Sequence, residues 1–342
     1  VRVGDLVPLA DGVRARVTTT ATLPKHRADV GSPSADPTVK QGPQPPRTAD
    51  STPSTLGGRY RLGGKLGSGG MGAVFEAQDS ATGASVAVKV MHAEAGAGEE
   101  NVRRFVREAR AAGSIDSPNA VKLIESGVDA DSGLPYIVME RLTGRDLSHV
   151  ARELGALDSR AAVELVLHAC NALAVAHARG IVHRDIKPSN LFAHESADGS
   201  LQVKVCDFGI AKQISLAEGA EASTELTRTG GLLGSPIYMS PEQAKSSKNV
   251  DGRTDVWSLC ISLHELLSGQ KPWAGRTTMG EIIVAICTEP VPALAEIAPW
   301  VDPALAAVVE KGLERDPTRR YATAKELADA LRPFGLGRAV TQ

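Results

Sequence analysis

The sequence of 342 residues has few aromatic residues, four scattered cysteines and no long apolar run. Without a Cys-x-x-Cys pair it cannot form a zinc ribbon, and the cysteine spacing argues against a disulfide framework. It has neither the roughly 18 apolar residues of a membrane helix nor the apolar region of a signal peptide. Its 38 Lys and Arg nearly balance its 40 Asp and Glu, so nothing favours nucleic acid or an anionic membrane as a partner. We therefore expect a cytoplasmic protein with neither partner.

Aromatic residues are also missing from the first 58 positions, and Tyr60 is the first of twelve. The same stretch holds eight of the twenty prolines and is rich in Thr, Ser and Ala. Such a segment cannot bury enough apolar surface to offset the entropy lost on ordering. We predict a disordered tail over residues 1–58, a folded domain over 59–334 and a short second tail over 335–342.

Within the predicted domain, strand-like patterns come first and helical ones later. Short apolar runs alternate with glycines over 60–90 and predict antiparallel hairpins, and residues 136–139 predict another buried strand. Apolar residues at helical spacing then predict helices over 99–113, 159–179 and 255–268. This order predicts an α+β protein, with a small lobe over about 59–140, a larger helical lobe over about 141–334 and a ligand cleft between them.

Gly67, Gly69 and Gly72 match the pattern G-x-G-x-x-G-x-V. Glycines let the backbone lie close to phosphates, because no side chain intervenes. A dinucleotide-binding turn would need a helix directly after the glycines, whereas residues 73–77 look like a strand. That alternative is excluded, but on this motif alone a plain glycine turn in a hairpin remains open.

Residues 86–90 read Val-Ala-Val-Lys-Val, and strand periodicity places Ala87 and Lys89 on one face with the three valines on the other. A methyl group beside an ammonium suits an adenine roof next to a phosphate-binding cation; the alternative is an edge-strand lysine in solvent. Glu108 of the first helix could hold Lys89 in place, although a solvated helix charge is the simpler interpretation of Glu108 alone.

The most informative segment is residues 183–190, His-Arg-Asp-Ile-Lys-Pro-Ser-Asn, followed by Asp207-Phe208-Gly209. The amide of Asn190 and the carboxylate of Asp207 supply hard oxygen ligands, which suit Mg²⁺ more than zinc. With these motifs in this order, residues 60–334 resemble the protein kinase superfamily, and within it the eukaryotic-like serine/threonine kinases of bacteria. The resemblance implies a bilobal protein kinase fold, with an antiparallel-sheet N-lobe carrying one main helix and a mainly helical C-lobe.

The resemblance also implies transfer of the ATP γ-phosphoryl group to Ser/Thr hydroxyls of proteins, with Mg²⁺ or Mn²⁺ as the metal. In this pattern Asp185 accepts the proton of the substrate hydroxyl, Lys187 neutralises charge on the transferred group, and Glu108 braces Lys89. The metal ligands are Asn190 and Asp207. The implied ATP-binding residues are Leu66, Gly67, Gly69, Gly72, Val74, Ala87, Lys89, Met139, Glu140, Leu142, Asp146 and Leu191.

Further positions concern regulation and structure. Arg184 directly before Asp185 marks, in this family, an activation loop ordered by phosphorylation, for which Thr227 and Thr229 are the candidate sites. The resemblance thus implies autophosphorylation, through a transient homodimer. The implied structural residues are Ser235, which meets the substrate, Glu242 paired with Arg320, and Asp255 in a central helix where Cys260 replaces a common glycine.

Two other functions remain in view. One is a catalytically inactive, kinase-like ATP-binding module, which would typically have lost Lys89, Asp185 or Asp207. The other is a small-molecule phosphotransferase of the same fold, which generally lacks the long segment between Asp207 and Glu242. We also expect His183 to pack structurally, rather than to act as a base, and Cys206 to be a buried structural thiol.

Overall fold

The computed structural model describes residues 6–10, 13–16, 53–69, 72–92, 99–196, 198–208, 236–245 and 250–336. Strands β1 (Leu6–Ala10) and β2 (Val13–Arg16) form an antiparallel hairpin within the stretch predicted to be a disordered tail. Asp11-Gly12 between them is a hairpin-turn signal. The overall composition of the tail concealed this local pattern.

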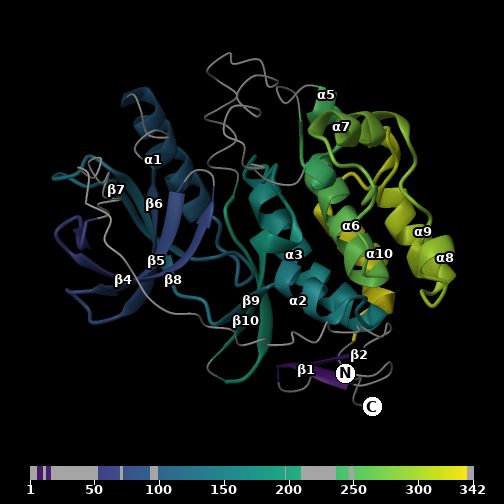
Figure 1. Cartoon of the computed structure of the whole chain (residues 1–342), viewed down its shortest axis with the longest axis horizontal. Helices are drawn as coiled ribbons and strands as arrows, with labels where there is room; N and C mark the ends of the chain where they lie inside the picture. The colour runs from purple at the N-terminus through teal and green to yellow at the C-terminus, as the bar shows by residue number, and fades with distance from the viewer. Residues whose placement is uncertain are drawn as a thin grey trace, which may run out of the picture.

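The N-lobe, residues 53–140, is built on a six-stranded antiparallel sheet in the order β3-β4-β5-β6-β8-β7 (Figure 1). Its strands are β3 (Thr55–Leu56), β4 (Tyr60–Gly69), β5 (Gly72–Asp79), β6 (Ser85–Met91), β7 (Leu123–Val128) and β8 (Pro135–Glu140). Helix α1 (Glu99–Gly113) packs against this sheet. The predicted hairpins, the strand over 136–139 and the helix over 99–113 are therefore confirmed.

The two faces of β6 point as the sequence predicts. Val86, Val88 and Val90 are buried in one cluster of the N-lobe, together with side chains of β3, β4 and β8. Met91 on the opposite face packs with Phe105 and other residues of α1. Hydrophobic burial on both faces fixes the register, because a slip by one residue would move the valines to the wrong face.

The folded domain begins before the predicted boundary at residue 59. The side chain of Leu56 in β3 is fully buried, and the Gly57 N–H donates a 2.8 Å hydrogen bond to Asp129 Oδ1. Gly57 has a φ of 56°, and a Cβ at this position would lie 2.3 Å from the hydroxyl of Tyr136. The chain can therefore enter the sheet only through a glycine here.

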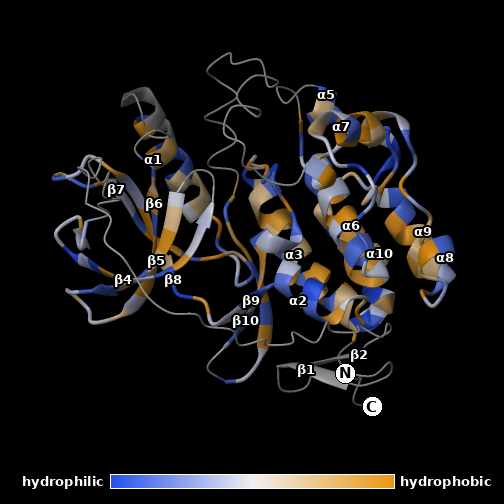
Figure 2. Ribbon diagram, viewed as in Figure 1, coloured by the Kyte–Doolittle hydropathy of each residue, from blue (hydrophilic) through white to orange (hydrophobic). Residues whose placement is uncertain are grey.

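The C-lobe, residues 141–336, contains a three-stranded sheet and the remaining helices (Figure 1). The sheet has the order β11-β10-β9, with strands β9 (Gly144–Asp146), β10 (Leu191–Glu195) and β11 (Leu201–Val205). The helices are α2 (Leu147–Leu154), α3 (Ser159–Ala178), α5 (Pro241–Lys245), α6 (Arg253–Ser268), α7 (Met279–Thr288), α8 (Leu294–Ile297), α9 (Pro303–Gly312) and α10 (Ala324–Leu331). The described part of the C-lobe also contains four short 3₁₀ turns: η1 (Pro188–Asn190), η2 (Pro236–Tyr238), η3 (Pro317–Arg319) and η4 (Arg332–Phe334). Figure 2 shows hydrophobic residues in the strands of both sheets and in the C-lobe helices.

Helices α3 and α6 lie at the centre of the C-lobe core, and a glycine follows the end of each. Gly180 after α3 and Gly269 after α6 adopt positive φ values of 72° and 71°, as glycines that end helices commonly do. Helix α3 has the length and apolar composition of a membrane span, contrary to the expectation that no stretch would reach that length. Ten of its residues are buried in the protein core, which accounts for its apolar composition.

The cysteine that replaces a common glycine in α6 has space because of a glycine in a neighbouring helix. Cys260 is 1% exposed, and burial raises the pKa of its thiol to about 12. A Cβ at Gly312 of α9 would lie 2.2 Å from Cys260 Sγ. The space for the Cys260 side chain therefore depends on Gly312.

A chain beginning at residue 59 should be less stable than one beginning at Pro53. The shorter chain loses β3 and the buried Leu56, whose burial contributes about 2 kcal/mol, whereas the longer one keeps both. Thermal and urea unfolding of the two chains would measure the difference, with the full chain and Leu56→Ala as controls. Equal stability of the two truncated chains would show that β3 adds nothing to the domain.

The substitution Gly312→Ala should destabilise the protein by about 1–3 kcal/mol through overpacking against Cys260. The same substitution in a Cys260→Ala background should cost clearly less, because the sulfur is gone. Urea unfolding of the four proteins in this double-mutant cycle measures the coupling. An equal cost in both backgrounds would contradict the contact.

Candidate active site

Three predicted catalytic and metal residues come together directly after α3. Lys187 Nζ lies 2.8 Å from Asp185 Oδ2, and Asn190 Nδ2 donates to the carbonyl oxygen of Asp185 at 2.7 Å and to its Oδ2 at 3.1 Å. The side chains of Asp185 and Lys187 keep 24% and 19% of their surface exposed. The carboxylate is thus oriented by a cation and an amide while remaining partly accessible to solvent.

This segment is held by Asp255 from the N-terminal turn of α6. The Asp255 carboxylate has no solvent exposure and accepts the backbone N–H groups of His183 and Arg184, both at 2.8 Å. His177 Nε2 lies 2.8 Å from the same carboxylate. Arg184 has a φ of 63°, a conformation that costs a non-glycine residue about 1–3 kcal/mol and persists only where its surroundings impose it.

His183 links the candidate catalytic segment, residues 183–190, to the segment that carries Asp207. Its Nε2 donates to the carbonyl oxygen of Cys206 at 2.9 Å, and its Nδ1 accepts the N–H of Asp185 at 3.2 Å. The ring is fully buried and lies 4.8 Å from the Phe208 ring between centroids. Both ring nitrogens are engaged by backbone groups, so His183 packs structurally, as the sequence analysis expected.

Lys89 pairs with a different carboxylate from the one predicted. Its Nζ lies 2.7 Å from Asp207 Oδ1, and no ion pair joins Lys89 to Glu108 among the described side chains. Glu108 interacts with other groups. Burial raises the pKa of Asp207, but the charge of Lys89 and its hydrogen bond outweigh that effect and hold the pKa below its usual value. Motif spacing could not reveal this competition between two carboxylates for one ammonium.

The predicted metal ligands have donor chemistry that fits Mg²⁺. Asp207 supplies a carboxylate with 45% of its side chain exposed, and Asn190 uses its Nδ2 on Asp185, which leaves its amide oxygen for a cation. Among the described residues, no group of three or more His, Cys, Asp and Glu side chains could hold a metal. Two oxygen ligands completed by phosphates are the usual arrangement for Mg²⁺.

The three motif glycines have different environments. A Cβ at Gly67 or Gly69 would meet nothing within 4 Å, whereas a Cβ at Gly72 would lie 2.2 Å from the carbonyl oxygen of Val90. Close packing of β5 on β6 therefore requires glycine at position 72 whether or not a phosphate binds there. Leu66, just before this motif, exposes 50% of its surface.

Among the predicted pocket residues, Val74 is half-buried, Ala87 is 5% exposed and Leu191 is fully buried in the C-lobe core. Leu191 thus presents no surface to a ligand in this structure, in contrast to its predicted role. Met139 and Glu140 end β8 and Leu142 follows it, where the chain passes into the C-lobe.

Asp146, predicted to bind ATP, has a structural role in this fold. It caps α2: its Oδ1 accepts the N–H groups of Ser148 at 2.9 Å and His149 at 3.0 Å, and its Oδ2 contacts the His149 ring. Burial raises the pKa of Asp146, but hydrogen bonds from Ser148 and His149 lower it below its usual value. An Asp directly before an apolar helical pattern is an N-cap signal that the sequence analysis missed.

The predicted pair of Glu242 and Arg320 is confirmed. Arg320 Nη1 and Nη2 lie 2.7 and 2.8 Å from the two carboxylate oxygens of Glu242, and the Arg320 side chain has no solvent exposure. Its guanidinium also stacks on Trp257, 4.9 Å from the ring centroid, and donates to backbone carbonyls. Thr227, Thr229 and Ser235 lie outside the described residues.

The sequence analysis missed the contacts that fasten residues 238–243 to the rest of the C-lobe. Tyr238 donates to Glu265 Oε2 at 2.6 Å, and Ser240 and Thr254 share a hydrogen bond of 2.6 Å. Gln243 Nε2 donates to the carbonyl oxygen of Arg184 at 2.9 Å. These contacts join distant parts of the chain, and no local sequence pattern predicts them.

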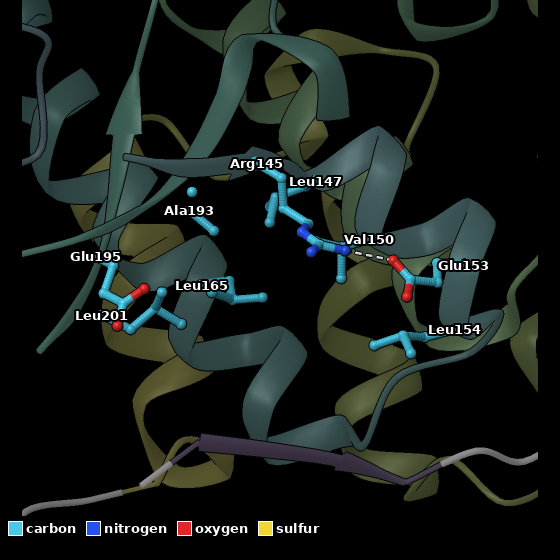
Figure 3. A pocket seen from close by; sticks show the side chains of 10 residues that line it. Arg145, Leu147, Val150, Glu153, Leu154, Leu165, Ala193, Glu195 and Leu201 are labelled. Carbon is cyan, nitrogen blue, oxygen red and sulfur yellow. Dashed lines mark hydrogen bonds and ion pairs between the residues drawn. The ribbon is translucent and has the colours of Figure 1, made fainter. Parts of the chain in front are cut away.

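A cavity of about 220 Å³ lies elsewhere in the C-lobe, between α2, α3 and the three-stranded sheet (Figure 3). The ion pair of Arg145 with Glu153 forms one side of it. Its lining contains none of the predicted site residues: Gly144, Arg145, Leu147, Val150, Glu153, Leu154, Leu165, Ala193, Glu195 and Leu201. We therefore assign it no part in the chemistry of Asp185.

Comparison with known proteins agrees with this geometry. The protein kinase domain family matches residues 60–331. The serine/threonine-protein kinase PknB of Mycolicibacterium smegmatis is 38% identical over 285 residues, which cover 82% of this chain and 44% of PknB. A probable serine/threonine-protein kinase of Corynebacterium efficiens is 36% identical over 275 residues, or 79% of this chain and 40% of that protein.

The chain thus spans less than half the length of these curated relatives. The crystal structure of the PknI kinase domain of Mycobacterium tuberculosis is similar with a TM-score of 0.63 at 25% identity, covering 82% of this chain and 98% of that one. The chain belongs to the protein kinase family, and its relatives include bacterial serine/threonine kinases.

Proposed function

We propose that this chain is a serine/threonine protein kinase that transfers the γ-phosphoryl group of ATP to hydroxyl groups of proteins. The observation that carries the proposal is the arrangement of Asp185, Lys187 and Asn190, which His183 links to the segment of Asp207. Lys89 reaches Asp207 from the other lobe. An inactive binding module has no need of all these groups.

In the proposed reaction, Asp185 accepts the proton of the substrate hydroxyl, and Lys187 stabilises charge on the transferred group. Lys187 already lies 2.8 Å from Asp185, so the cation is close to the site where negative charge develops. Asn190 and Asp207 would hold Mg²⁺, which neutralises phosphate charge when bound. The exposed backbone around Gly67 and Gly69 would cover the phosphates.

The acceptor class rests on the relatives and on Pro188 after Lys187, a pattern that resembles serine/threonine kinases. A small-molecule phosphotransferase is less well supported, because the chain retains the segment from Asp207 to Glu242 and the Glu242–Arg320 pair that fastens its end. We include in the proposal a cytoplasmic location and a transient homodimer, in which one copy phosphorylates the activation loop of the other.

The substitution Asp185→Asn should lower phosphoryl transfer to a generic basic protein by about 10²–10⁴-fold, since a positioned base typically contributes that much. Lys187 and Asn190 keep a partner atom, so the variant should fold. Radiolabelled ATP measures transfer, and thermal melting checks folding. Asp198→Asn, in the turn between β10 and β11, is the matched control and should transfer at the wild-type rate. A folded Asp185→Asn protein with a near-wild-type rate would refute the role of Asp185.

Mass spectrometry of the purified protein should find phosphate on Thr227 or Thr229, and neither should be modified in Asp185→Asn. A phosphate adds about −1.5 to −2 charge and can make charge-assisted bonds with Arg184. Competent kinases also need the pair of the strand lysine with the helix glutamate, and phosphorylation of the activation loop controls that pair. Lys89 and Glu108 do not form this pair here. The variant Thr227→Ala/Thr229→Ala should therefore turn over substrate more slowly. An unmodified but fully active wild-type protein would contradict this switch.

A further inference from the structure

The two lobes are connected by more than the chain that leaves β8. The segment after α1 is hydrogen-bonded to β11: Val121 N–H donates to the carbonyl oxygen of Val205 at 3.0 Å, and Val205 N–H donates to that of Asn119 at 2.8 Å. Asn119 Nδ2 also donates to the carbonyl oxygen of Val203 at 3.0 Å. The strand that leads into Asp207 is therefore held by the linker between α1 and β7.

One ion pair extends this connection to the end of β8. Lys204 Nζ in β11 lies 2.8 Å from Glu140 Oε1, and the two side chains are only 11% and 26% exposed. The same Oε1 accepts the N–H of Lys122 at 2.8 Å, and Glu140 N–H donates to the Lys122 carbonyl oxygen at 2.9 Å. The Glu140 carboxylate thus has donors from β11 and from the linker, both with good geometry.

The pair joins the two ends of the nucleotide site of the proposed function. Glu140 is the last residue of β8, where the backbone would bind adenine, and Lys204 stands three residues before Asp207. Because both side chains are largely shielded, solvent screens their attraction less than in an exposed pair. Removing one partner would leave a shielded charge uncompensated.

We propose that the Glu140–Lys204 ion pair is a strut that fixes the spacing between the adenine end and the metal end of the nucleotide site. Lys204 is then a positioning residue, which acts through Glu140 and Asp207. A nucleotide gains the full benefit of two contact regions only where their spacing is held before binding. This inference rests on the proposed function and adds to it a residue that the motifs do not include.

The test is calorimetric binding of ATP with Mg²⁺, together with steady-state kinetics, for Lys204→Met, Lys204→Arg, Glu140→Gln and the double variant Glu140→Gln/Lys204→Met. Lys204→Met should raise the Kd and the KM for ATP at least about fivefold, the lower end of common coupling between sites, with a smaller change in kcat. Lys204→Arg, which keeps the positive charge, should bind ATP with nearly the wild-type Kd. Glu140→Gln keeps an acceptor for the Lys122 N–H and should match Lys204→Met, with little further loss in the double variant.

Arg59→Met is the matched control. Arg59 forms a two-bond ion pair with the buried Asp79 elsewhere in the N-lobe sheet, so its loss weakens the lobe without touching Glu140. An equal rise in Kd for Arg59→Met and Lys204→Met would overturn the strut, as would additive effects of the two strut substitutions. So would a Kd for Lys204→Met within about twofold of the wild type.

The two proposals fail in different ways. A wild-type chain that does not bind ATP overturns the proposed function together with the strut. A wild-type chain that binds ATP and transfers phosphate, while Lys204→Met retains wild-type Kd and KM, overturns the strut alone. If Lys204→Met does not fold, Glu140→Gln and Lys204→Arg decide the question by the same comparison.

Discussion

A buried carboxylate, Asp255, holds residues 183–190, the candidate catalytic segment, in a backbone conformation that this segment would not adopt alone. Asp255 receives two backbone N–H groups and His177 in a site without solvent exposure. Hydrogen bonds to a charged group contribute about 1.5–3 kcal/mol each, enough to offset the cost of the positive φ of Arg184. The orientation of Asp185, and with it that of Lys187 and Asn190, depends on this anchor.

The same anchor connects the active site to the largest core of the protein. Asp255 belongs to α6, whose residues from Thr254 to Ser268 are all buried. Arg320 stacks on Trp257 of that helix while it binds Glu242 through both nitrogens. A rigid helix therefore positions both the catalytic segment and the start of α5, and rigid elements hold functional groups more accurately than loops do. Several polar groups on α6 are tolerated in this core because they form hydrogen bonds there: Asp255 with His177, Thr254 with Ser240, and Glu265 with Tyr238.

Much of this site could be predicted from sequence, because its residues follow one another at short, fixed spacing. The segment from His183 to Asn190 and the Glu242–Arg320 pair are where the motifs place them. The start of the domain before residue 59 could not be predicted, since it depends on the burial of Leu56 and on the hydrogen bond from Gly57 to Asp129. The requirement for Gly72 likewise arises from Val90 on another strand. Both result from close contacts between residues that are distant in the sequence, and composition cannot predict such contacts.

Charge competition around Lys89 accounts for the largest difference between prediction and structure. One ammonium lies within reach of Asp207 and is expected to serve Glu108 and phosphates as well, and it can neutralise only some of these anions at once. In this structure it neutralises Asp207, whose pKa is lowered as a result. A divalent cation on Asp207 would take over that role and release the ammonium. The structure thus pairs Lys89 with Asp207 rather than with Glu108, a choice that no sequence motif specifies.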